Sequence, residues 1–287
     1  MILTMRDRIV TFPRRPLVMG IVNINDDSFS GDGSLLIERA IEAAQRHVTA
    51  GADMIDVGGE SARTNRPEIS ELEESARILP FLHRFSECHE GKKPVDEIQI
   101  FPPLLSINTW RARVADATLR VGGHLLNDMS AFQMSENARI AARYGAGLLI
   151  MHSVGLPKKR HTDVRYADVL RTLESFFDQK INEAIAAGVA REAIVLDPGI
   201  DFAKQKTDNL RLYRELKFLT RFERPILLPV SRKTVIGEVL EIADPADRDA
   251  GTIACVVAGT VRGASIFRVH NVRAAAQALR VIYPIVE

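Results

Sequence analysis

Eight short apolar segments of this chain each end in polar side chains, and a helical pattern follows each of them. The first segment shows this most clearly, because Leu17 to Val22 is apolar and suited to a strand, and Asn23 follows directly. A run of this length is typical of a strand buried on both faces. Such strands alternating with helices predict a parallel α/β sheet whose polar strand ends meet at one edge.

The number of strand–helix units restricts the possible folds further. The strands are expected at Leu17–Val22, Met54–Val57, Leu104–Ile107, His124–Leu126, Gly147–Ile150, Ala193–Leu196, Pro225–Val230 and Ala264–Phe267. Eight strand–helix units without a break in composition predict a (β/α)8 TIM barrel, forming one domain over residues 1–287. An open doubly wound sheet is the alternative, but no GxGxxG follows the first strand. A short edge strand is also expected at Ile98 to Phe101.

Composition excludes several classes of partner. The chain has 38 Lys and Arg residues against 37 acidic ones, so no global field recruits nucleic acid or an anionic membrane. Cys88 and Cys255 have no metal-binding spacing and are expected to be reduced thiols. The N-terminal residues lack the apolar core of a signal peptide, and no segment approaches the roughly 18 apolar residues of a membrane span. A soluble, cytoplasmic protein is expected.

Cationic side chains stand at the ends of several predicted strands. They are Arg63, Lys233, Arg268 and His270, with Arg232 directed elsewhere. In a barrel these ends converge, so the set predicts a polyanionic ligand such as a phosphate or diphosphate. Arginine offers such oxygens a bidentate fork, and lysine offers a point charge. The alternative is that each cation pairs with a nearby carboxylate.

Amide and carboxylate side chains form a second group, consisting of Asn108, Asn127 and Asp197. Together they offer donors and acceptors to a planar heterocycle, and a carboxylate can bind a guanidine-like edge through two charge-assisted bonds. Asp197 could instead be a turn residue, because Pro198 and Gly199 follow it.

The first loop suggests a metal ligand. The side-chain oxygen of Asn23 suits Mg²⁺, which also takes phosphate oxygens from a substrate. The polar residues from Asn25 to Ser30 are expected to make ordinary hydrogen bonds within their loop. His152 is expected to contact residues of the site and not the ligand itself. The remaining histidines have no zinc-binding spacing.

Seven motifs resemble those of dihydropteroate synthases in order and spacing. They are MGIVNINDDSFS, IDVGGESAR, LLNDMSA, MHSVGLP, LDPGIDFAK, VSRKT and FRVH, and they extend over nearly the whole chain. The resemblance implies a TIM barrel that joins hydroxymethyl-dihydropterin diphosphate to 4-aminobenzoate, releasing diphosphate, with Mg²⁺ as cofactor. It also implies a homodimer.

The resemblance assigns roles to individual residues. Asn23 matches the position that binds the metal and the diphosphate, and Arg63, Arg268 and His270 match diphosphate-holding positions. Asn127, Asp197 and Lys233 match the pterin pocket. Thr234 lies where the aminobenzoate carboxylate is held at a helix N-terminus, and Phe202 lies near the ring of the amine substrate. Lys233, Arg268 and Asp197 are the expected catalytic residues.

Several positions depart from the family pattern. Asn108 replaces an aspartate that faces the pterin, which removes a charge but can keep a hydrogen bond. Asn25, the segment 62–65, Asp201, Ala203 and Pro229 also differ, mostly on the aminobenzoate side. This pattern resembles the acquired, sulfonamide-insensitive branch of the family. A pterin-binding methyltransferase and a non-catalytic pterin-binding paralogue are the alternative functions.

Overall fold

A parallel sheet of eight strands runs through the computed structural model, which describes residues 1–25, 34–61, 66–133, 136–159 and 161–287. The strands are β3 (Leu17–Asn23), β4 (Met54–Gly58), β5 (Leu104–Asn108), β6 (Leu125–Asp128), β7 (Gly147–Met151), β8 (Ile194–Asp197), β9 (Leu227–Leu228) and β10 (Ile266–Val269). They pair in the order β8-β7-β6-β5-β4-β3-β10-β9. A parallel bridge between Leu196 and Ile226 joins the two ends of this order, which confirms the predicted barrel.

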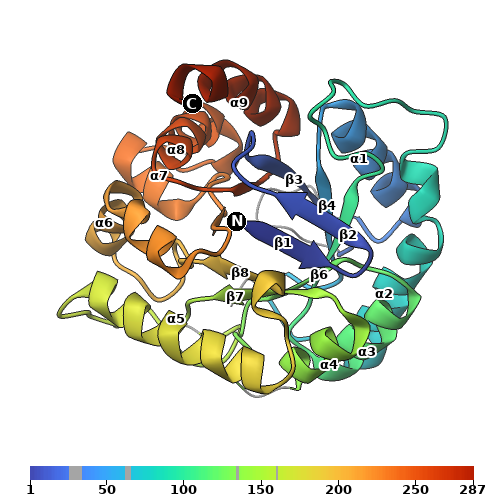
Figure 1. Cartoon of the computed structure of the whole chain (residues 1–287), viewed down its shortest axis with the longest axis horizontal. Coiled ribbons are helices and arrows are strands. Elements are labelled where there is room, and N and C mark those ends of the chain that lie inside the picture. The colour runs from blue at the N-terminus through green and yellow to red at the C-terminus, as the bar shows by residue number, and fades with distance from the viewer. Residues whose placement is uncertain (26–33, 62–65, 134–135, 160) are drawn as a thin grey trace.

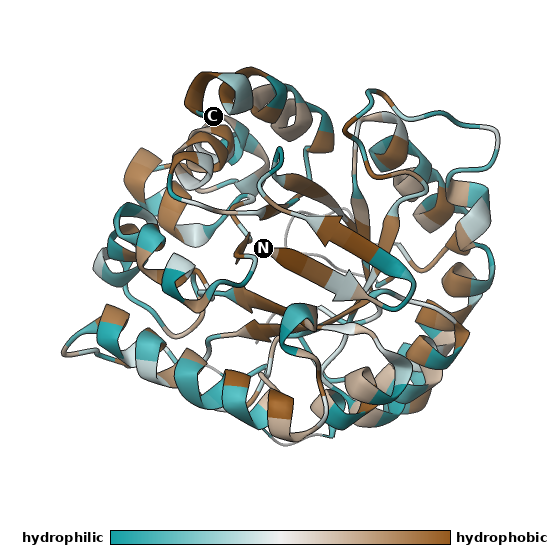
Figure 2. Ribbon diagram, viewed as in Figure 1, coloured by the Kyte–Doolittle hydropathy of each residue, from teal (hydrophilic) through white to brown (hydrophobic). Residues whose placement is uncertain are grey.

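A ring of helices surrounds the strands (Figure 1). The helices are α1 (Ile37–Thr49), α2 (Glu71–His83), α3 (Ala112–Val121), α4 (Asn137–Tyr144), α5 (Val169–Ala186), α6 (Lys206–Arg214), α7 (Thr234–Leu240), α8 (Asp249–Val261) and α9 (Val272–Val286). Amphipathic spacing produces this arrangement, as in α1, where Ala40, Ile41, Ala44 and Val48 are buried. Figure 2 accordingly shows apolar strands inside and mixed helices outside. No helix in the described ranges is long and apolar enough to cross a membrane.

An N-terminal hairpin, which the sequence did not predict, covers one end of the barrel. Its strands β1 (Ile2–Met5) and β2 (Arg8–Thr11) are antiparallel, and Figure 1 shows them in the middle of the ring of helices. Leu3, Met5 and Phe12 are buried in the same apolar cluster as Met54 and Leu104 of the barrel strands. The hairpin therefore fills the amino-terminal end of the barrel and leaves the carboxyl-terminal end for a site.

Alternation along the strands separates an apolar layer from a polar one. Inside the barrel, the apolar cluster contains one layer of strand residues: Met19, Met54, Leu104, Leu125, Leu149, Val195, Leu227 and Ile266. Two residues further along a strand, the side chain points to the same face. On β4, β5, β6, β8 and β10 this next residue is polar: Asp56, Ser106, Asn127, Asp197 and Arg268. The barrel core thus changes from apolar to polar within one step of the pleat.

One predicted strand is wrong. Residues 98–101 form no strand, and side chains hold this segment in place of a ladder. The Nε2 of Gln99 donates to the carbonyls of Val48 and Ala52 at 3.1 and 2.8 Å, and the Ile100 amide donates to Asp53 at 2.9 Å. These bonds attach the segment to the end of α1 and to residues 52 and 53, which directly precede β4.

Candidate active site

A fully buried carboxylate, Asp56 of β4, gathers the polar side chains at the carboxyl-terminal end of the barrel. It accepts hydrogen bonds from Ser106 Oγ at 2.6 Å and from Asn108 Nδ2 at 3.3 Å. Asn127 Nδ2 lies 3.2 and 3.3 Å from its two oxygens, and Arg268 Nε donates to it at 2.7 Å. Four strands therefore contribute to one network, which brings three of the predicted site residues together.

Sequence analysis missed Asp56, although a signal was present. An aspartate between Ile55 and Val57 in an otherwise apolar strand has to be paired when the strand is buried. Asn108 takes part in that pairing, because its side-chain amide donates to Asp56.

Arg268 pairs with a carboxylate, as the alternative interpretation of the cations required, but only through Nε. Its side chain is 22% exposed, and its terminal nitrogens donate no hydrogen bond within the described ranges. A guanidinium anchored at Nε keeps its outer edge for an anion. The pairing with a carboxylate is therefore observed for Arg268, and binding of an anion at its outer edge stays a prediction.

Asp197 ends β8 and is buried. One of its oxygens accepts from the Gly199 amide at 2.7 Å, so the turn role is real. The described residues place no hydrogen bond on its other oxygen. Burial raises the pKa of Asp197 to about 6, although the charges of Lys233, Lys204 and Arg268 oppose the rise. The free oxygen in this setting fits a hydrogen-bonding partner on a ligand.

Lys204 and His152 hold the loop after β8 in place through hydrogen bonds. Lys204 Nζ lies 2.9 Å from His152 Nδ1 and 2.9 Å from the carbonyl oxygen of Gly199. Burial lowers the pKa of His152 to about 2, so the ring is neutral and accepts this bond. A side chain at Gly199, where φ is +67°, would come within 1.9 Å of the His152 carbonyl oxygen. His152 thus supports the site through the loop, as predicted.

Lys233 lies on the other side of this loop. Its Nζ donates to the Ile200 carbonyl at 3.0 Å and lies 4.9 Å from the centre of the Phe202 ring. Burial lowers the pKa of Lys233, and the charges of Asp201 and Asp197 act in the opposite direction. The structure therefore brings Lys233, Phe202 and Asp197 together, as the resemblance implies.

Thr234 begins α7, and its amide is already bonded. Its N–H donates to Asp201 Oδ2, and the Val235 amide donates to Asp201 Oδ1 at 3.3 Å. Asn209 Nδ2 also donates to Asp201 Oδ1, at 3.2 Å. The chain's own carboxylate thus lies where the resemblance places a substrate carboxylate.

His270 follows β10 and packs against the end of the neighbouring unit. Ser231 Oγ lies 2.8 Å from His270 Nδ1 and accepts from the His270 amide at 3.1 Å. Arg232 instead bonds to Asp249, with Nε to Oδ1 at 2.8 Å. This pair confirms that Arg232 is directed elsewhere.

Two asparagines, the last residue of β3 and the second residue after it, differ in their surroundings. Asn23 ends the strand in register with Gly58 of β4. Asn25 is 2% exposed, and neither its Nδ2 nor its Oδ1 has a hydrogen-bond partner among the residues that the structure describes. The predicted hydrogen bonds within the loop from Asn25 to Ser30 stay a prediction, because residues 26–30 lie outside the described ranges. An unsatisfied buried amide is costly unless a ligand or solvent completes it.

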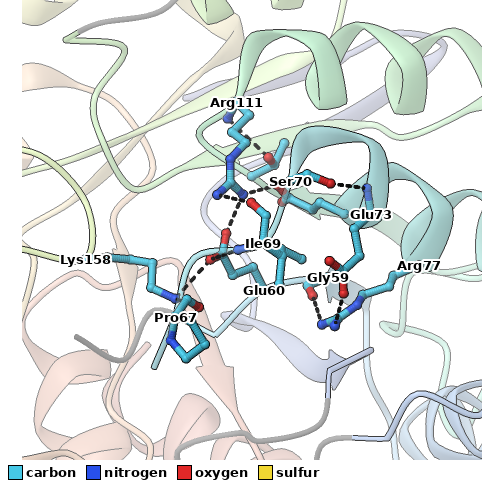
Figure 3. Close-up of polar contacts among 11 residues, drawn as sticks. Gly59, Glu60, Pro67, Ile69, Ser70, Glu73, Arg77, Arg111 and Lys158 are labelled. Atoms are coloured by element: carbon cyan, nitrogen blue, oxygen red, sulfur yellow. Dashed lines mark hydrogen bonds and ion pairs between the residues drawn. The ribbon is translucent and has the colours of Figure 1, made fainter. Parts of the chain in front are cut away.

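Arg63 lies outside the described ranges, but both flanks of its segment are fixed (Figure 3). Lys158 Nζ donates to Glu60 Oε1 at 2.9 Å and to the Pro67 carbonyl at 3.0 Å. Arg111 also bonds to Glu60, and its NH2 donates to the Ile69 carbonyl at 2.9 Å. This nearly buried network joins the loops after β4, β5 and β7.

Comparison with known proteins agrees with this geometry. The model of the pterin binding enzyme family matches residues 19–270. The dihydropteroate synthase of Escherichia coli is 35% identical over 269 residues, covering 93% of this chain and 90% of that protein. The one from Bacillus subtilis is 34% identical, covering 92% of this chain and 86% of that protein.

Solved structures agree as well. The Yersinia pestis dihydropteroate synthase with a sulfonamide drug complex superposes with a TM-score of 0.89 at 34% identity, covering 99% of this chain and 98% of that one. The Xanthomonas albilineans enzyme with 4-aminobenzoic acid gives 0.86 at 30% identity, covering 99% and 97%. The chain belongs to the dihydropteroate synthases, transferases of folate biosynthesis built on a pterin-binding barrel.

Proposed function

We propose that the carboxyl-terminal end of this barrel joins hydroxymethyl-dihydropterin diphosphate to 4-aminobenzoate through the residues around Asp56. The observation that carries this proposal is the convergence of Asn127, Asp197 and Arg268 from three strands. The first two offer an amide and a carboxylate to a flat heterocycle. Arg268 offers a guanidinium edge to an anion beside it.

The reaction needs no covalent nucleophile. The lone pair of the arylamine attacks the pterin methylene carbon, the carbon–oxygen bond to diphosphate breaks, and the amine nitrogen loses a proton to solvent. Negative charge develops on the leaving diphosphate, where Arg268 and His270 stabilise it, with Arg63 as a further predicted contact. Asp197 and Lys233 orient the pterin ring, and Phe202 packs against the arylamine.

Mg²⁺ fits this arrangement as a cofactor shared between protein and substrate. No group of three or more His, Cys, Asp or Glu side chains that could hold a metal occurs in the described part of the chain. Magnesium is commonly bound by one or two protein oxygens together with phosphate oxygens and water. Asn23 would supply the protein oxygen, and the bound ion would neutralise charge on the diphosphate.

We further propose that the protein works in the cytoplasm as a homodimer. Exposed apolar side chains on neighbouring helices support the dimer: Val261 on α8, and Val281 and Ile285 on α9. A second copy covering them would remove this apolar surface from water.

Removing either of two cations tests the reaction directly. Lys233→Ala and Arg268→Ala should each lower kcat/KM about 10²-fold or more, the scale for losing one contact made in the transition state. The measurement is diphosphate release on mixing both substrates. Arg273→Ala, which removes an exposed cation on α9, is the matched control.

Near-wild-type turnover in both variants would refute the assigned site. A methyltransferase would release no diphosphate from this mixture. A pterin-binding paralogue without turnover would fail to restore growth to a strain lacking its own synthase, which the wild-type protein should restore.

The raised pKa of Asp197 gives the pterin site a pH dependence. Above about pH 6 the group is a carboxylate, and below it the neutral form loses a charge-assisted bond. Pterin affinity measured by calorimetry should therefore fall as the pH decreases through about 6, approaching tenfold per unit for one proton. Asp197→Asn should bind more weakly and without this slope, and an unchanged slope in that variant would assign the titration to another group.

The altered aminobenzoate side leads us to propose weak inhibition by sulfonamides. Asp201 already bonds to the Thr234 and Val235 amides, which reduces the donors left for an inhibitor. Sulfamethoxazole should therefore inhibit this enzyme less than it inhibits the Escherichia coli relative under matched conditions. Equal inhibition constants would contradict this proposal.

A further inference from the structure

We propose that Lys204 is a positioning residue for both substrates, because it holds the loop after β8 in the shape that presents Asp197 to the pterin and Phe202 to the arylamine. The inference rests on the proposed condensation, since it takes these two side chains as groups that meet the substrates. Lys204 acts through them and does not bind a ligand itself.

Protein acceptors occupy the whole ammonium group of Lys204. Its Nζ donates to the carbonyl oxygens of Gly199 and Phe202 at 2.9 and 3.0 Å. It also lies 2.9 Å from Nδ1 of His152 and 3.3 Å from the carbonyl oxygen of the same residue. An ammonium group has three hydrogens to donate. These acceptors therefore leave none for a substrate, and any effect of Lys204 on the substrates passes through the loop.

The loop needs this support because its backbone is strained. Gly199, Asp201 and Ala203 have positive φ angles of +67°, +67° and +51°. This region is uncommon for residues with a side chain and persists only where surrounding contacts enforce it. The Phe202 amide closes a turn by donating to the Gly199 carbonyl at 3.1 Å. Lys204 binds the carbonyl oxygens at both ends of this turn and so enforces its shape.

Both site residues are attached to the turn that Lys204 holds. Asp197 accepts a hydrogen bond from the Gly199 amide at 2.7 Å, so the turn orients this carboxylate. The Phe202 carbonyl is bound by Lys204, and the Phe202 ring lies 4.9 Å from Lys233 Nζ. Loss of the Lys204 side chain would therefore release both positions at once.

Lys204 also acts on Asp197 through its charge. Burial raises the pKa of Asp197 to about 6, and the positive charges of Lys233, Lys204 and Arg268 limit that rise. Burial lowers the pKa of Lys204 itself to about 7, so its ammonium form is present while Asp197 titrates. Lys204 is also faced by Asp201 and Asp208, which favour its charge, by Lys233, which opposes it, and by the neutral ring of His152.

Replacing Lys204 by methionine should change the pH dependence of pterin binding. Without the positive charge the pKa of Asp197 should rise, so the neutral form should replace the carboxylate at a higher pH. The midpoint of pterin affinity, measured by calorimetry as a function of pH, should increase by about one pH unit, the scale of one nearby opposite charge. Lys204→Arg keeps the charge and should keep the midpoint of the wild type.

The same variant should bind the amine less well. A loosened turn no longer holds Phe202 for the arylamine, so KM for 4-aminobenzoate should rise about tenfold, the scale of one lost aromatic contact. The measurement is diphosphate release at a saturating concentration of the pterin substrate. Lys206→Met removes one charge from an exposed position at the start of α6 and should change neither the midpoint nor this KM.

The outcomes separate this inference from the proposed function. Circular dichroism checks that each variant is folded, and Lys204→Gln takes the place of Lys204→Met if the latter does not fold. A midpoint and a KM both equal to those of the wild type would overturn the role of Lys204, as would the same changes in Lys206→Met. Absence of diphosphate release from the wild type would overturn the proposed reaction instead, and the calorimetric midpoint would still decide the role of Lys204.

Discussion

A single carboxylate without access to water, Asp56, constrains the arrangement of this active site. A buried charge is tolerated only when it is paired and fully hydrogen-bonded. Ser106, Asn127 and Arg268 meet that requirement from three different strands. Because each donor is fixed to the same acceptor, their remaining polar atoms are held in fixed positions relative to one another. This is the preorganisation that electrostatic stabilisation of a leaving group requires.

The polar end depends on the apolar end of the same strands. One step of the pleat below Asp56, Met54 belongs to an interior layer that the N-terminal hairpin completes with Leu3 and Met5. Burial of this layer contributes roughly 25 cal/mol per Å² of apolar surface, and it allows the strand ends to carry groups that add little stability. The division agrees with the general rule that barrel enzymes place stability at one end and chemistry at the other.

The sequence was informative where local patterns decide structure. All eight barrel strands were predicted within a few residues, since apolar runs bounded by turns signal buried strands. Predictions failed where distant contacts decide. The hairpin has a turn at Arg6, with φ +54°, and not the Asn-Gly or Asp-Gly that announces one. Gln99 fixes its segment through carbonyls about 50 residues away, which no local pattern encodes.

Site residues show the same limit. The motifs identified Asn127, Asp197 and Lys233, because polar residues at strand ends are visible in sequence. They did not reveal that Asp201 and Thr234, 33 residues apart, are bonded to each other. A departure from the family pattern was evident at Asp201, but its consequence depends on where the loop after β8 meets α7.

The most direct measurement is a crystal structure of this protein with hydroxymethyl-dihydropterin diphosphate bound. The account predicts the pterin ring against Asn127 and Asp197, and diphosphate oxygens on Arg268 and His270, with Arg268 still bonded to Asp56. A ligand bound elsewhere on the molecule, or an Arg268 that leaves Asp56 to reach the diphosphate, would contradict it.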